Sequence, residues 1–154
     1  MRQTRIEPLL SVAAAIPLLA ECGLPVADIP RDSAQPFFAV RLDDALVAVV
    51  GLELHQPFGL LRSLAVAPAQ RGRGLARDLV AFAESFAAAQ GVDTLFLLTT
   101  SAAEFFTRLG YAPASRAAAP PAIQATAQFA GLCPASAAFL SKHLAAGNPC
   151  PVLP

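Results

Sequence analysis

The sequence predicts a mixed α/β fold built as one domain. With 154 residues, of which 55% are hydrophobic, the chain can bury one core of ordinary size but hardly two. Two apolar runs separated by an Asp-Asp pair indicate a β-hairpin, and strand-like and helix-like segments alternate in the middle of the chain. We place the domain at residues 1–146 and expect residues 147–154, which include three prolines, to form a loose tail.

The N-terminal third begins with a short predicted strand at residues 3–6 and a helix that ends near Cys22, where Gly23 stops it. The apolar run of this helix is too short to span a bilayer, and Pro17 interrupts it. A helix packed on the sheet is therefore preferred to a leader or membrane segment. A hairpin follows, because aspartate tolerates the backbone of a tight turn; its apolar runs are residues 37–42 and 45–54, around Asp43-Asp44.

The middle of the chain contains its most regular helical pattern, at residues 74–90, after a buried strand at residues 60–66. We expect Leu75, Leu79, Phe82 and Phe86 on the buried face of this helix, and Arg77, Asp78, Glu84 and Ser85 on the exposed face. The remaining predicted elements are a strand at 94–100, a helix at 101–109, a helix from Pro120 through Phe129 and a strand at 136–144.

The charge and cysteine content exclude several classes of partner and site. Eleven basic and eleven acidic residues balance, so no global field attracts nucleic acid or an anionic membrane, and the expected partner is a small molecule. Three cysteines are too few for a disulfide scaffold, and no Cys or His spacing suggests a metal site. Cys133 lacks a convincing base and is interpreted as a small buried residue. A reducing cytoplasm is the expected compartment, and the sequence allows a homodimer.

The loop at residues 71–74, Arg-Gly-Arg-Gly, has the features of an anion site. Its two glycines let the backbone approach a bulky anion, and the first turn of the following helix offers unpaired N–H groups at the positive end of its dipole. Arg71 and Arg73 can add charge-assisted hydrogen bonds to a phosphate. An ordinary arginine-bearing turn fits equally well, whereas a P-loop and a GxGxxG fingerprint are absent.

Two motifs place this loop in a family pattern. Leu64-Ala-Val-Ala-Pro68 followed by Gln70-Arg-Gly-Arg-Gly-Leu-Ala76 resembles the acetyl-CoA signature of the GCN5-related N-acetyltransferases (GNAT). Ala102-Ala-Glu-Phe-Phe-Thr-Arg-Leu-Gly-Tyr111 resembles a second segment of the same family at the expected distance. The resemblance implies the GNAT fold, with a mixed central sheet of about six to seven strands that is flanked by helices and splayed between the strands at 60–66 and 94–100.

The resemblance also implies an acetyl-CoA site. The pantetheine arm would pair with the backbone of residues 64–66, and the pyrophosphate would lie on the amides of residues 71–76. The amine of a small-molecule acceptor would attack the thioester directly, so neither a covalent intermediate nor a metal is required. The cofactor-binding residues that the resemblance implies are Leu64, Ala65, Val66, Arg71, Gly72, Arg73, Gly74, Leu75, Ala76, Thr99 and Phe106.

Two positions depart from the family pattern. Phe106 stands where the family often has a tyrosine that protonates the coenzyme A thiolate, and Thr99 stands where it often has asparagine. Because phenylalanine cannot donate a proton, the acid is Tyr111, Thr99 or water, or none is needed because a thiolate leaves easily. Tyr111 is thus a catalytic candidate, but it occupies a position that a packing phenylalanine usually fills.

The candidate base and the candidate acceptor ligands come from two strands. Alternation along the strand places Glu53 and His55 on one face. Glu53, an acid in an apolar strand, is expected to have a raised pKa and to accept the acceptor's proton; pairing with Arg62 fits equally well. Arg62 interrupts an apolar strand and requires a carboxylate, from Glu53 or from the substrate. Arg62 and His55 are therefore the substrate-binding candidates, although a histidine near a strand end is often merely exposed.

A narrower resemblance concerns the acceptor. The segments Gly51-Leu-Glu53, Gly59 to Val66, Leu97-Leu-Thr-Thr100 and parts of 118–136 resemble the bacterial arsenic-resistance N-acetyltransferases of the second type. That implies an amino acid or an amino-bearing arsenical as acceptor. A related resemblance is to stand-alone amino-acid acetyltransferases of the N-acetylglutamate synthase kind. A non-catalytic acetyl-CoA-binding module is the third alternative, because Phe106 replaces the tyrosine.

Overall fold

The computed structural model describes residues 6–9, 12–23, 36–126, 129 and 137–144. The chain divides into two compact units. The first unit comprises residues 1–52 and 62–83, and the second comprises residues 53–61 and 84–154. The predicted boundary of a single domain at residue 146 stays a prediction, and the predicted tail lies outside the described residues.

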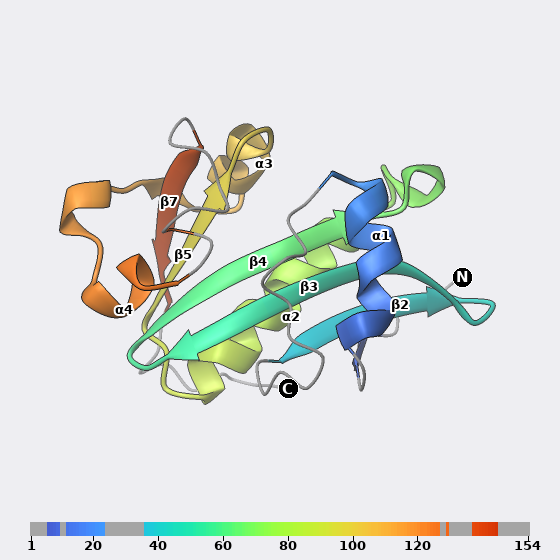
Figure 1. The fold of residues 1–154 in the computed structure, drawn as a ribbon, viewed down its shortest axis with the longest axis horizontal. Coiled ribbons are helices and arrows are strands. Elements are labelled where there is room, and N and C mark those ends of the chain that lie inside the picture. Colours follow the sequence, from blue (N-terminus) through green and yellow to red (C-terminus); the bar gives the residue numbers. More distant parts are fainter. Residues whose placement is uncertain (1–5, 10–11, 24–35, 127–128, 130–136, 145–154) are drawn as a thin grey trace. The chain divides into compact units, whose positions relative to one another are not determined.

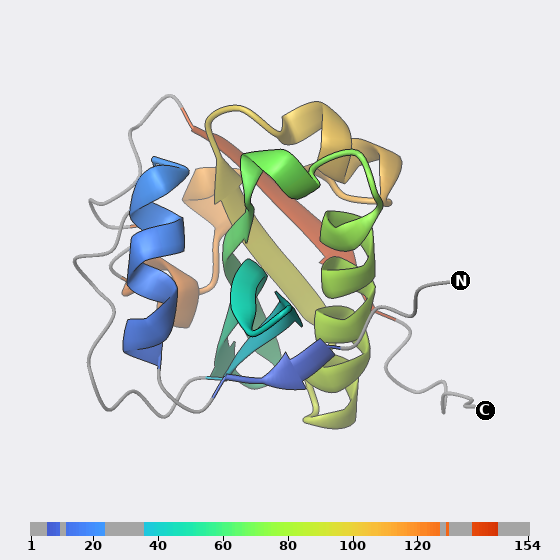
Figure 2. The ribbon, with the colours of Figure 1, turned by 90° about the vertical axis from the view of Figure 1, so that its right-hand side faces the viewer.

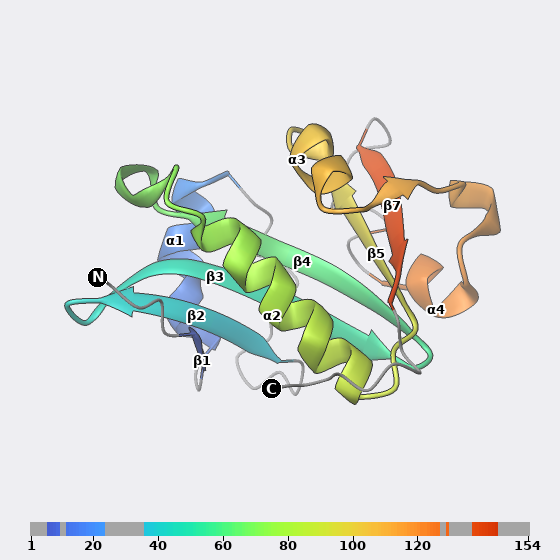
Figure 3. The same ribbon diagram turned by 180° about the vertical axis from the view of Figure 1, so that it is seen from behind.

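The first unit contains the N-terminal strands and two helices that cover opposite faces of β2 and β3, as Figures 1, 2 and 3 show. Its elements are β1 (Ile6–Pro8), the 3-10 helix η1 (Val12–Ala15), α1 (Ile16–Glu21), β2 (Phe37–Leu42), most of β3 (Ala45–His55), the second half of β4 (Phe58–Val66), the 3-10 helix η2 (Pro68–Gln70) and the start of α2 (Leu75–Ala89).

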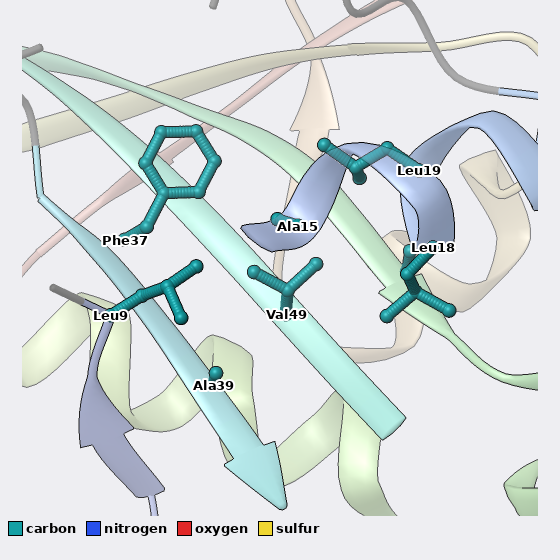
Figure 4. Close-up of a cluster of buried hydrophobic side chains, with 8 residues drawn as sticks. Leu9, Ala15, Leu18, Leu19, Phe37, Ala39 and Val49 are labelled. Atoms are coloured by element: carbon teal, nitrogen blue, oxygen red, sulfur yellow. The ribbon is translucent and has the colours of Figure 1, made fainter. Parts of the chain in front are cut away.

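The face of the first unit under α1 is a dry apolar cluster, drawn in Figure 4. Leu18 and Leu19 of α1 pack there against Val49 of β3, and all three are buried. Gly51 is required beside this cluster, because a Cβ on it would lie 2.7 Å from the ring of Phe37, its partner in the β2–β3 ladder. The cluster fixes which face of β3 points towards α1. Its buried members are Leu9, Ala15, Leu18, Leu19, Phe37, Ala39, Val49 and Ala65.

The second unit is built on two neighbouring strands, with α3 and α4 on opposite faces of them (Figures 1 and 3). Phe96 and Phe139 stack across the β5–β7 pair, with ring centroids 5.3 Å apart, and Ile123 of α4 is buried in the same cluster. The elements of this unit include β5 (Thr94–Thr99), α3 (Ala103–Arg108), β6 (Ala112–Pro113), the 3-10 helix η3 (Arg116–Ala118), α4 (Pro121–Gln124) and β7 (Ala138–His143).

Within the described residues, seven strands form one sheet in the order β1-β2-β3-β4-β5-β7-β6. β4 and β5 pair in parallel, and the ladders of β1–β2, β2–β3, β5–β7 and β6–β7 are antiparallel. The predicted mixed sheet of six to seven strands is therefore confirmed. The parallel ladder of β4 and β5 runs from Phe58↔Thr94 to Leu60↔Phe96, at the beginnings of both strands.

Most predicted elements are present with shifted ends. β1 extends the predicted strand at residues 3–6 to Pro8, and residues 3–5 of that prediction lie outside the described part. The first helix opens with the 3-10 turn η1, and Pro17 stands in the first turn of α1, where its missing N–H breaks no hydrogen bond. The helix predicted through Phe129 ends at Gln124, and residues 127–128 are not described. The short β6 was not predicted.

The predicted faces of α2 are partly wrong. Phe82 was placed on the buried face but is 37% exposed, with its ring edge against Phe38 at 4.9 Å between centroids. Glu84 was placed on the exposed face, yet its side chain is only 17% exposed and bonds inside the second unit. The fully buried row is instead Leu79, Ala83 and Ala87, because small alanines let the helix approach its neighbours closely.

The β2–β3 turn offers a test of backbone strain. Asp43 and Asp44 both have left-handed backbones, with φ of 51° and 66°, as the hairpin turn predicted from sequence requires. Because glycine adopts this region without a Cβ clash, Asp44→Gly should raise the free energy of unfolding by about 0.5–1 kcal/mol. Urea unfolding measures the change. Asp78→Gly in α2 is the control and should lower stability, because a right-handed helix disfavours glycine; a destabilised Asp44→Gly would contradict the turn geometry.

Candidate functional site

The connection from β4 to α2 has the geometry of an anion cradle. Gly72 and Gly74 both have left-handed backbones, with φ of 81° and 82°. The first hydrogen bond into α2 runs from the Asp78 N–H to the Gly74 carbonyl at 3.0 Å. The amides of Leu75 and Ala76 precede that bond, so they belong to the group of N–H donors that a helix start leaves for an outside acceptor.

The space around this connection also fits a bound diphosphate. A Cβ built on Gly72 meets no atom within 4 Å, so the backbone at that position is open to an approaching group. Gly74 faces the Arg77 guanidinium, 3.2 Å from the same ideal Cβ, which adds positive charge. Backbone donors, the positive helix end and a guanidinium are the groups that hold phosphate in proteins.

The side chains of Arg71 and Arg73 lie on different parts of the first unit. The Arg71 Nε donates to the Val66 carbonyl at 3.0 Å, and its Nη2 lies 3.6 Å from the Cys22 sulfur, so Arg71 braces the end of β4. Arg73 lines an open hollow of about 560 Å³ beside the β2–β3 turn. The predicted contacts of both guanidinium groups with phosphate stay predictions. The other residues that line the hollow are Leu42, Asp43, Ala45, Val47 and Gln70.

β4 carries a backbone feature that the sequence analysis missed. Ser63 has a left-handed backbone, with φ of 59°, inside an otherwise extended strand. Such a residue is uncommon outside turns, and it changes the direction of the peptide groups that follow, here at Leu64. The neighbouring Arg62 is buried, with 7% of its surface exposed. Its Nε donates a hydrogen bond to the Ser63 hydroxyl at 3.0 Å. The sequence of an apolar strand contains no local signal for a left-handed backbone at Ser63.

In the second unit, Thr99 organises the start of α3. Its hydroxyl oxygen accepts hydrogen bonds from the N–H of Ala102 at 2.9 Å and of Ser101 at 3.4 Å. A threonine oxygen that serves a helix start in this way is already engaged. Thr99 therefore shapes the turn that follows β5, and its predicted contact with the cofactor stays a prediction.

Tyr111 is part of a partly buried polar network. Its hydroxyl donates to Glu84 Oε2 at 2.9 Å, and its ring packs edge-on against Phe106. Lys142 donates to Glu84 Oε1 at 3.0 Å and to the Leu109 carbonyl at 2.9 Å. Burial, followed by the charge of Glu84, raises the pKa of Tyr111 well above its usual value. This arrangement supports the packing interpretation of Tyr111 over the catalytic one.

Glu53 and His55 point the same way from the end of β3, as alternation predicted. The Nε2 of His55 lies 3.5 Å from Glu53 Oε1. The Glu53 side chain is 15% exposed and that of His55 is 28% exposed, so both are partly shielded from water. Their predicted roles as base and acceptor ligand, and the pairing of Glu53 with Arg62, stay predictions.

The sequence profile of the acetyltransferase (GNAT) family matches residues 9–111 of this chain. The chain belongs to the GNAT family. The match includes both motifs of the sequence analysis, so the GNAT fold that they implied is confirmed.

Named relatives of this GNAT chain include amino-acid acetyltransferases. The amino-acid acetyltransferase of Ectopseudomonas mendocina (strain ymp) is 32% identical over 120 residues, which cover 75% of this chain and 28% of that protein. The structure of N-acetylglutamate synthase from Neisseria gonorrhoeae, complexed with coenzyme A and N-acetyl-glutamate, has a TM-score of 0.73 and 20% identity over 93% of this chain and 36% of the other. A GNAT-family acetyltransferase from Staphylococcus aureus Mu50 has a TM-score of 0.67 and 16% identity over 91% and 99% of the two chains.

The GNAT chain thus spans about 28% of a curated relative and about 36% of the synthase structure. The narrower resemblance to the arsenic-resistance group stays a prediction, because the curated relatives are amino-acid acetyltransferases. Across the residues that the structure describes, no helix is long and apolar enough to cross a membrane, and no three His, Cys, Asp or Glu side chains gather as a metal site. Cys133 lies outside that part of the chain.

Replacing Tyr111 by phenylalanine separates packing from catalysis. The ring stays while Glu84 loses one donor, so the free energy of unfolding should fall by about 1–2 kcal/mol. The raised pKa keeps the Tyr111 hydroxyl protonated in the folded protein, whereas an unfolded tyrosine ionises near pH 10. The free energy of unfolding of the wild type should therefore also fall above about pH 10, and the variant should lack this contribution. Urea unfolding across pH measures both. A hundredfold fall in kcat with unchanged stability would instead make Tyr111 catalytic.

The glycine pair allows a matched test of the anion cradle. Gly74→Glu should weaken acetyl-CoA binding by roughly 100-fold, because it adds bulk and negative charge beside the donors of α2. Gly91→Glu is the control: Gly91 has a similar left-handed backbone, with φ of 91°, at the opposite end of α2. Isothermal titration should show affinity lost in the first variant only. Equal acetyl-CoA affinity of the two variants would contradict the assignment of the pyrophosphate to this loop.

Proposed function

We propose that this GNAT chain is an acetyl-CoA-dependent N-acetyltransferase whose acceptor is the α-amino group of a free amino acid. The observation that carries the proposal is the pair of left-handed glycines, Gly72 and Gly74, directly before α2. That geometry suits a diphosphate, and the matched family supports an acyl-coenzyme A as its source. The names of the curated relatives support the amino-acid acceptor.

Acetyl-CoA, when bound, supplies an activated acetyl thioester. The amides of residues 72–76 would hold the diphosphate, and the backbone of residues 64–66 would pair with the pantetheine arm, sharing the Val66 carbonyl with Arg71. Glu53 would take a proton from the acceptor's ammonium group, so that the neutral nitrogen attacks the acetyl carbon. Because Phe106 cannot donate a proton and Tyr111 donates to Glu84, the departing thiolate would be protonated by water or would leave as the anion.

Arg62 is the residue we propose for the acceptor's carboxylate. It is a buried arginine in β4, next to the left-handed Ser63. A guanidinium binds a carboxylate in a planar, bidentate way that an ammonium does not reproduce. This would select amino acids over simple amines, since the latter offer no carboxylate for the guanidinium to bind.

One assay tests the function. The purified chain receives acetyl-CoA and a panel of amino acids, their amides and amino-bearing arsenicals, while release of free thiol is followed. Thiol release that depends on an amino acid is the expected result. Release only with the arsenicals would favour the arsenic-resistance alternative. Acetyl-CoA binding without acceptor-dependent release would favour a non-catalytic module, which the replacement of the usual tyrosine by Phe106 makes the second candidate.

The proposed clamp predicts a selective defect. Arg62→Lys keeps the charge but loses the bidentate geometry, so KM for the amino acid should rise about tenfold or more. The affinity for acetyl-CoA should stay within about twofold, and the preference for an amino acid over its amide should shrink. Steady-state kinetics with both acceptors measure this. An unchanged KM for the amino acid would remove Arg62 from acceptor binding.

A further inference from the structure

The pair of Glu53 and His55 has a graded exposure that the proposed reaction does not use. Both side chains project from one face of β3, with Glu53 Oε1 and His55 Nε2 3.5 Å apart. Glu53 is the more enclosed, at 15% exposure, and His55, the last residue of the strand, is nearly twice as exposed at 28%. The pair therefore leads from a shielded carboxylate to a group that water reaches.

The start of β4, which follows the pair in the chain, is apolar. Two residues, Gln56 and Pro57, connect β3 to β4, so His55 and Phe58 flank this connection in the chain. Phe58 packs in the cluster of Leu60 and Phe96, and the first four residues of β4 carry no titratable group.

The charged groups on the neighbouring elements of the second unit already have partners. Arg116 donates to the Ala137 carbonyl, and Thr94 lies between Asp93 and His143. The Glu84 carboxylate accepts hydrogen bonds from Tyr111 and Lys142. His55 has one titratable partner among the contacts described for it, the carboxylate of Glu53.

The proposed reaction must release one proton. An ammonium acceptor and a thioester give an amide and a thiol, and of the two protons that the nitrogen loses, one ends on the sulfur and one enters water. If Glu53 takes the first proton, its carboxyl group must lose that proton before the next turnover. Glu53 is only partly exposed, and a base within hydrogen-bond reach of its carboxyl group offers a route for that proton.

The geometry points to a proton relay, in which His55 takes this proton from Glu53 and releases it to water. The neutral imidazole accepts at Nε2, where the Glu53 oxygen lies, and the resulting imidazolium gives up the proton on Nδ1 to solvent. This inference rests on the proposed function, because it assigns the fate of the proton that Glu53 removes. His55 acts through Glu53 and does not touch the acceptor, unlike the direct acceptor contact expected from the sequence.

The kinetic test uses the chain's two histidines as a matched pair. His55→Gln should lower kcat by about tenfold or more, flatten the acidic limb of the kcat profile against pH, and leave acetyl-CoA affinity unchanged. Imidazole in the buffer should restore turnover several-fold in His55→Ala. His143→Gln, which alters the histidine beside Thr94, should change neither kcat nor the profile. Wild-type turnover and profile in His55→Gln, or a loss that imidazole does not restore, would overturn the relay.

A second measurement does not depend on any acceptor. Nitrogen-15 spectra of the histidine side chains, at one pH, report how the protons are shared between Nδ1 and Nε2. Glu53→Gln should change this distribution in His55 and leave that of His143 as it is. Unchanged His55 signals would show that the pair is not coupled and would overturn the relay.

The variant Glu53→Gln also separates the relay from the proposed function. Slow turnover in Glu53→Gln with normal turnover in His55→Gln would remove the relay alone. Wild-type turnover in Glu53→Gln would show that Glu53 is not the base, and it would overturn the relay as well. Slow turnover in both variants, with rescue by imidazole only in His55→Ala, supports both assignments.

Discussion

The structure depends most on how the chain leaves β4 and enters α2. The strand ends at Val66 and the helix begins at Leu75, and both glycines between Arg71 and the helix have left-handed backbones. An L-amino acid with a Cβ is strained in that region, whereas glycine is not. Because the helix starts immediately after the second glycine, its first N–H groups are presented together at one end. A change in either glycine would reorient those donors, so the anion cradle and the helix direction share one constraint.

One side chain at that connection, Arg71, holds the end of β4. Arg71 turns back to the Val66 carbonyl, and the Ala67 N–H donates to the Val47 carbonyl at 2.8 Å. The strand end is thus held by bonds to its own unit, while the amides of Leu75 and Ala76 belong to the donors that a helix start leaves for an outside acceptor. In an anion site of this kind the backbone supplies the specific donors, and the arginines set the local potential.

One carboxylate, that of Glu84, joins several segments of the second unit by hydrogen bonds. Glu84 in α2 accepts from Tyr111 and from Lys142, and Lys142 also reaches the carbonyl of Leu109. Three segments far apart in the sequence meet at this group, and each donor finds an acceptor, so burial of the charges is compensated. A tyrosine committed to this network is poorly suited to donate a proton elsewhere. The chemistry of the proposed reaction therefore rests more on Glu53 and His55 than on the tyrosine that the sequence first suggested.

The sequence by itself determined the features whose signals are local. The turn at Asp43-Asp44 and the helical period of residues 75–89 follow from backbone preferences within a few residues. Only the tertiary structure decided the rest: the inward direction of Glu84, the exposure of Phe82, the left-handed Ser63 and the turning back of Arg71. The direction of Glu84 and the exposure of Phe82 depend on packing against segments distant in the chain, and Arg71 also reaches the distant Cys22. Such contacts leave no periodic or compositional trace in the sequence.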